Sequence, residues 1–119
     1  MAPKILVVDD DPAISEMLTI VLESEGLKPI PVMDGNDAVP AFEQHEPDLI
    51  LLDLMLPDMH GYDVLKKLRV ARVTTPVLIL SALVGYAALV AAIMAALRAG
   101  SPLRVPVVFV TAAHDLQNC

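Results

Sequence analysis

Aromatic residues are scarce in this chain of 119 residues, which has two tyrosines, two phenylalanines and no tryptophan. Hydrophobic residues nevertheless make up 55% of the sequence, so a core has to be built mainly from aliphatic side chains. The single cysteine, Cys119, excludes an internal disulfide and suits a reducing, cytoplasmic setting. The length favours one domain over residues 1–119.

Basic residues are also few. Eight Lys and Arg stand against fifteen Asp and Glu, which gives a formal net charge of −7. An acidic chain gains nothing from a phosphate backbone, so direct nucleic-acid binding is not expected. Carboxylates gathered at one place would instead attract a divalent cation.

Charge is missing altogether from Pro76–Leu97, a stretch long enough to raise the question of a membrane span. The other interpretation is a strand followed by an amphipathic helix. Ser81 and Gly85 interrupt the stretch, and the alanine-rich face of its second half can meet water without much penalty. These features favour the strand and helix, without a membrane partner.

Five short aliphatic runs recur along the chain, separated by helical patterns. Most show no alternation of polar and apolar residues, which is typical of parallel strands covered on both faces. The runs are Ile5–Val8, Pro29–Met33, Leu49–Leu52, Pro76–Leu80 and Val105–Val110. They predict a three-layer α/β fold, flavodoxin-like and doubly wound, with five parallel strands in the order 2-1-3-4-5.

The first helix has the clearest boundaries. Asp11 is a good N-cap, Pro12 suits the first helical position, and Gly26 suits a left-handed stop. Three further helices are expected over about 37–45, 61–70 and 84–99.

Acidic residues follow two of the predicted strands. Asp9 and Asp10 follow the first, and Asp53 follows the third, directly after a strongly apolar run. If these strands are neighbours, the three carboxylates converge at the topological switch point of the sheet, where such folds bind ligands. Their mutual repulsion calls for a cation, and a few open oxygen ligands suit Mg²⁺ together with a phosphate.

Several blocks of residues together resemble the response-regulator receiver family, whose fold is the CheY-like version of the sheet described above. The blocks are Ile5–Asp11, Asp34–Gly35, Pro47–Gly61 and Thr75–Ala82. The resemblance covers residues 4–82, and the block around Asp53 is the most specific part.

The resemblance implies a signalling switch rather than an enzyme, phosphorylated by a sensor histidine kinase or a phosphotransfer protein. Asp53 would be the phosphoacceptor. Asp10, Asp53 and the backbone carbonyl of Met55 would bind Mg²⁺, and Asp9 would act through a water molecule. Ser81 would donate its hydroxyl to the phosphoryl group.

The last third of the chain, residues 83–119, departs from the family. Receivers carry a lysine at the end of strand five, and no lysine stands there; Arg104 lies at the wrong end of that strand. Residues 111–119 leave room for about two helical turns, so the fifth helix is expected to be missing or truncated. Phe109 is the candidate for the family's switch aromatic, and a homodimer is possible.

Three explanations of this tail remain open. Thr75–Ala82 and Val105–Ala112 resemble each other, which fits a divergent or spliced natural receiver, or an engineered or recombined one. The third explanation makes 105–112 the true fourth strand and 71–104 an insertion, and the interval between Asp53 and Ser81 argues against it. The alternative function is a receiver-like interaction module in which phosphorylation is uncoupled from any switch.

Overall fold

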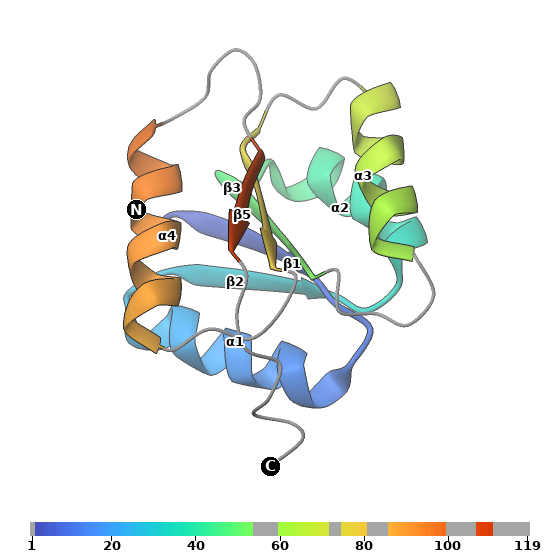
Figure 1. Cartoon of the computed structure of the whole chain (residues 1–119). Helices are drawn as coiled ribbons and strands as arrows, with labels where there is room; N and C mark the ends of the chain where they lie inside the picture. Colours follow the sequence, from blue (N-terminus) through green and yellow to red (C-terminus); the bar gives the residue numbers. More distant parts are fainter. Residues whose placement is uncertain (1, 54–59, 72–74, 81–85, 100–106, 111–119) are drawn as a thin grey trace.

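The computed structural model describes residues 2–53, 60–71, 75–80, 86–99 and 107–110. Residues 53, 60–62, 80, 86, 99 and 107–110 are described by their backbone alone. The predicted fold class is confirmed: a central parallel sheet has helices on both sides (Figure 1).

Five strands form this sheet in the order β2-β1-β3-β4-β5, as the sequence predicted. All neighbouring strands are parallel. The strands are β1 (Lys4–Val8), β2 (Lys28–Val32), β3 (Leu49–Asp53), β4 (Val77–Leu80) and β5 (Val107–Val110). The central strands β1 and β3 are buried on both faces, which explains why their residues show no polar alternation.

The local signals of the first helix, α1 (Pro12–Ser24), are confirmed. Asp11 Oδ1 accepts hydrogen bonds from the backbone N–H groups of Ala13 at 2.9 Å and Ile14 at 3.4 Å. Pro12 is the first helical residue, and Gly26 has a φ of 78° just after the helix.

One face of the sheet is covered by α2 (Ala38–His45), which follows the short 3-10 helix η1 (Gly35–Asp37), and by α3 (His60–Val70). Here Val64 and Leu68 of α3 pack with apolar side chains of β1, β3 and β4. The opposite face is covered by α1 and by α4 (Tyr86–Ala99), and Figure 1 shows these two helices on the same side.

The position of α4 completes the core on the face of α1. Helix α1 contacts β1 and β2, whereas α4 contacts β4 and β5. Leu89 and Ile93 of α4 are buried in the same cluster as Leu51 and Leu78 of the sheet. The predicted alanine face is also correct in outline, since Ala87, Ala88, Ala91 and Ala95 are exposed, although Ala96 is buried.

The connection through α4 has an unusual hand. In the strand order, the step from β1 to β2 and the step from β4 to β5 run in opposite directions. Because α1 and α4 cover the same face, the two connections have opposite hands. The connections through α2 and α3 share the hand of α1. Since such crossovers are right-handed in about 98% of cases, β4-α4-β5 is the exception.

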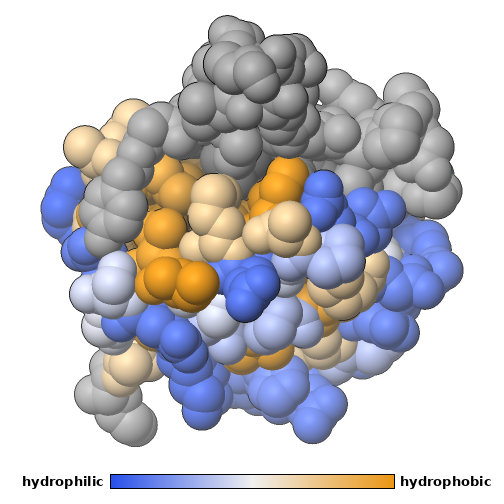
Figure 2. Space-filling model, turned by 90° about the horizontal axis from the view of Figure 1, so that it is seen from below, coloured by the Kyte–Doolittle hydropathy of each residue, from blue (hydrophilic) through white to orange (hydrophobic). Residues whose placement is uncertain are grey.

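The outer surface on the side of α1 is mostly hydrophilic, with some apolar areas (Figure 2). Along α1 itself, Met17 and Ile20 are the large apolar side chains that are exposed.

Among the residues that the structure describes, no helix is long and apolar enough to cross a membrane. The expected loss of a fifth helix concerns residues 111–119, which lie outside the described residues.

We expect Ile93→Ala to lower the free energy of unfolding by about 2–4 kcal/mol, because it opens a cavity under α4. Ala91→Gln, at an exposed position of the same helix, should change it by no more than about 0.5 kcal/mol. Double-mutant cycles measured by urea unfolding test which face of the sheet Ile93 packs against. Ile93 should couple with Leu78, which shares its cluster, and not with Ile79 on the other face. Coupling to Ile79 alone would contradict this placement of α4.

Candidate functional site at the carboxyl edge of the sheet

The predicted acidic residues come together through the pairing of β1 with β3. Val8 of β1 is aligned with Leu52 of β3, so Asp9 and Asp53 follow aligned residues of neighbouring strands. The two backbones therefore bring Asp9 and Asp53 to the same edge of the sheet. Helices α1 and α3, which follow these strands, lie on opposite faces, so this edge is the topological switch point.

Asp9 occupies a buried position at this edge, with 1% of its surface exposed. Its backbone N–H donates to the carbonyl of Val32 at 3.1 Å, which holds the residue beside the end of β2. Its Oδ1 accepts a hydrogen bond from the N–H of Asp11 at 2.9 Å, and this bond orients the carboxylate.

The three consecutive aspartates have different surroundings. Asp10 is exposed, whereas Asp9 is buried and Asp11 caps α1. The interpretation of Asp11 as a helix cap is confirmed by its hydrogen bonds. Asp9 and Asp10 have no such capping role, and they remain the acidic candidates next to β3.

Part of the predicted site lies outside the described residues. This holds for Met55 and Ser81, and for the side chains of Asp53 and Phe109. The backbone of Asp53 ends β3, and the backbone of Phe109 pairs with Ile79 in β5. The roles assigned to these residues stay predictions.

The residues at this edge fit a magnesium ion by their chemistry. No group of three His, Cys, Asp or Glu side chains that could hold a metal occurs in the described part of the chain, where the side chain of Asp53 is not included. The buried Asp9 and the exposed Asp10 offer carboxylate oxygens, the donors that Mg²⁺ prefers, at an edge open to solvent.

No lysine of the chain is placed as the family's conserved lysine would be, and this agrees with the sequence. Lys4 and Lys28 lie at the amino ends of β1 and β2, away from the acidic edge. Lys4 Nζ donates to the carbonyl of His45 at 3.1 Å. Lys66 and Lys67 lie on α3. Arg104 is outside the described residues.

Comparison with known proteins identifies the family. The family model of the response regulator receiver domain matches residues 5–100. The chain belongs to the response regulator receiver family. The match reaches beyond the blocks recognised in the sequence and includes α4.

Several curated proteins are similar to this receiver. The DNA-binding response regulator MtrA of Mycolicibacterium smegmatis is 51% identical over 82 residues, which are 69% of this chain and 36% of MtrA. The probable transcriptional regulatory protein TcrX of Mycobacterium tuberculosis is 46% identical over 78 residues, 66% of this chain and 33% of TcrX. The chain thus spans about a third of the length of these relatives.

Solved receiver structures share the fold. The receiver domain of the Francisella response regulator 1452 is 31% identical, with a TM-score of 0.65, over 97% of this chain and 89% of that one. A CheY-like receiver domain from Methylobacillus flagellatus has a TM-score of 0.70 over 81% of this chain and 99% of that one. Its 24% identity makes it a likeness of fold alone.

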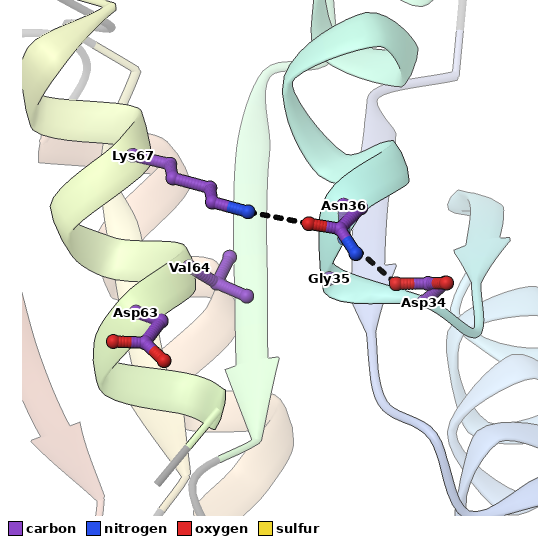
Figure 3. Close-up of a pocket in the computed structure, with 6 residues that line it drawn as sticks. All are labelled: Asp34, Gly35, Asn36, Asp63, Val64 and Lys67. Carbon is purple, nitrogen blue, oxygen red and sulfur yellow. Dashed lines mark hydrogen bonds between the residues drawn. The ribbon is translucent and has the colours of Figure 1, made fainter.

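A polar pocket that the sequence did not predict lies next to the receiver's β2 end, with a volume of about 210 Å³ (Figure 3). It is lined by Asp34, Gly35, Asn36, Asp63, Val64 and Lys67. Lys67 Nζ donates to Asn36 Oδ1, and Asp34 Oδ1 accepts from the N–H of Asn36 at 2.9 Å. Neither Asp9 nor Asp10 is among the described residues that line this pocket.

Gly35 allows α3 to approach η1 closely at this pocket. A Cβ atom added to Gly35 would overlap Cγ2 of Val64 on α3. Val64 is a core residue that packs with β1 and β3, so it has little room to move. The Asp34–Gly35 pair was noted in the sequence as part of the family pattern, but only the tertiary contact gives the reason for the glycine.

We expect Gly35→Ala to destabilise the receiver by about 1–3 kcal/mol, because the added methyl group overpacks this contact. Thermal or urea unfolding measures the effect. In a Val64→Ala background the same change should cost much less, since the overlapping methyl group is gone. An equal penalty in both backgrounds would show that the backbone of Gly35, and not Val64, causes the loss.

Proposed function

We propose that this receiver accepts a phosphoryl group on Asp53 from a sensor histidine kinase or a phosphotransfer protein. The observation that carries the proposal is the aligned pairing of β1 with β3, which ends both strands with acidic residues at the switch point of the sheet. Membership of the family and the sequence around Asp53 support it. The relatives named above are full-length regulators, so an output beyond this segment is also a proposal.

In the reaction, a carboxylate oxygen of Asp53 attacks the phosphorus of a phosphohistidine. The new bond makes an acyl phosphate, the phosphorus–nitrogen bond breaks, and the electron pair returns to the histidine nitrogen. The protein's task in such a transfer is positioning and neutralisation of charge. The receiver is therefore a phosphoacceptor in a signalling pathway, with no separate substrate to turn over.

Asp10, Asp53 and the carbonyl of Met55 would hold Mg²⁺, and Asp9 would orient a water molecule beside it. The cation, when bound, neutralises charge on the phosphoryl oxygens. Asp9 suits an indirect role because its Oδ1 already accepts the hydrogen bond from Asp11, whereas Asp10 is exposed. Ser81 would donate its hydroxyl to a phosphoryl oxygen.

The response to phosphorylation would pass through Ser81 and, as the candidate aromatic, Phe109. The receiver does this without a lysine at the end of β5. The family uses that lysine to pair with the phosphoryl group, so its loss weakens the coupling between modification and switch. The acidic net charge of −7 supports a partner other than nucleic acid for this segment.

Incubation with a small phosphodonor and Mg²⁺ should add one phosphoryl group to the chain, measured as intact mass. Asp53→Asn should abolish the gain, because the amide is no nucleophile. Asp48→Asn is the matched control, since Asp48 is exposed and directly precedes the opposite end of the same strand. A mass gain that survives in Asp53→Asn, or no gain in the wild-type protein, would refute the proposal.

Mg²⁺ should raise the midpoint of thermal unfolding, and Asp10→Asn should weaken Mg²⁺ affinity roughly tenfold or more, because one carboxylate is lost. Asp11→Asn should leave the affinity unchanged, since Asn also caps helices well and Asp11 serves α1. Mg²⁺ titrations followed by calorimetry test this. If both variants lose affinity equally, the separate roles of the adjacent aspartates are wrong.

A further inference from the structure

Strand β2 forms one edge of the sheet in the described part of the chain. The strand and the segments that flank it lie within residues 2–53, which the structure describes without a gap. At the start of β2, the N–H of Lys28 donates to the carbonyl of Pro3, and at its end the carbonyl of Val32 accepts from the N–H of Asp9. Lys28 and Val32 therefore turn their backbone groups toward β1.

The residues of β2 that face out of the sheet are both prolines. Backbone groups of successive residues in a parallel strand point to alternate sides, so Pro29 and Pro31 turn theirs away from β1. Proline has no N–H group. Within β2, the outer edge thus presents carbonyl acceptors and no hydrogen-bond donor.

Core packing does not explain a proline at position 31. Ile30 packs with the core on the face of α2 and α3, and side chains of a strand alternate between its two faces. The rings of Pro29 and Pro31 therefore lie toward the face of α1, where Pro29 is half-buried and Pro31 is exposed. Proline is also disfavoured in strands in general. The feature that the two residues share is the missing donor.

We propose that Pro29 and Pro31 close the β2 edge to strand addition, so that no second copy of this chain extends the sheet on this side. An edge strand with unpaired donors and acceptors is a template for another strand. Strand β2 has five residues, and its only charged residue, Lys28, stands at one end. Charge therefore gives the middle of this edge little protection, and the prolines provide it.

The pairing that the prolines prevent has a definite geometry. If two copies met antiparallel around a twofold axis at Ile30, Pro29 of each copy would face Pro31 of the other. Facing residues of this kind normally exchange two N–H···O hydrogen bonds, four in all. Here all four donors are missing, and the carbonyl groups would lose water without gaining a partner, which costs free energy.

The test restores the missing donors step by step in the full chain. Pro31→Val returns two of the four hydrogen bonds, and Pro29→Val/Pro31→Val returns all four. Sedimentation from low-micromolar to near-millimolar concentration measures the association. We expect both variants to associate more strongly than the wild type, and the double variant at least about tenfold more tightly than Pro31→Val, because it adds two hydrogen bonds.

Pro40→Val is the matched control. Pro40 is an exposed proline of α2, so this change removes a proline and adds the same side chain away from the sheet edge. Its association should match that of the wild type. Urea unfolding establishes that each variant is folded. If the double variant does not fold, Pro31→Val still provides the test, because the side chain at this position is exposed.

Hydrogen exchange gives a second measurement, at the N–H group that Pro31→Val introduces at position 31. This group should exchange rapidly in dilute protein, because it faces solvent. Its protection should rise with protein concentration as the edges pair. Both measurements are made without a phosphodonor, so they do not depend on phosphorylation of Asp53, and failure of one proposal leaves the other standing.

Three outcomes would overturn the inference. The folded variants could associate no more than the wild type, which would show that another feature closes this edge. Pro40→Val could associate as strongly as the edge variants, which would assign the effect to loss of any proline. The new N–H group at position 31 could be protected in dilute protein, which would mean that it points into the sheet.

Discussion

The parallel pairing of β1 with β3 is the interaction on which the rest of the receiver depends. These two strands are buried on both faces, so their side chains must be apolar up to the point where the sheet ends. Asp9 and Asp53 stand at that point on adjacent strands. A shift of one residue between the two strands would move Asp9 and Asp53 out of their aligned positions and would also turn every core residue of the shifted strand to the other face.

The same sheet needs cover on the face of α1, and α4 provides it. Helix α1 lies over β1 and β2, whereas α4 lies over β4 and β5. With Leu89 and Ile93 of α4 in the same cluster, Leu51 and Leu78 are buried. Burial of this surface is a large favourable term, and it accompanies a crossover of the less common hand.

The acidic edge and the outer strands have different physical characters. At the acidic edge, Asp9 and Asp10 lie beside the end of β3, where the proposed Mg²⁺ would offset the negative charge of the carboxylates and of an incoming phosphoryl group. At the outer edge of the sheet, Pro29 and Pro31 of β2 provide no backbone N–H group for pairing with another strand.

Local patterns in the sequence were enough to predict the five strands, the caps of α1 and the positions of Asp9, Asp10 and Asp53 at strand ends, because each depends on neighbours along the chain. Only the tertiary structure decided which face of the sheet α4 covers, since periodicity defines the apolar side of a helix and not the surface it meets. The contact of Gly35 with Val64 and the link from Lys67 to Asn36 also join segments far apart in sequence. No local signal specifies such contacts, because they exist only after the helices have packed.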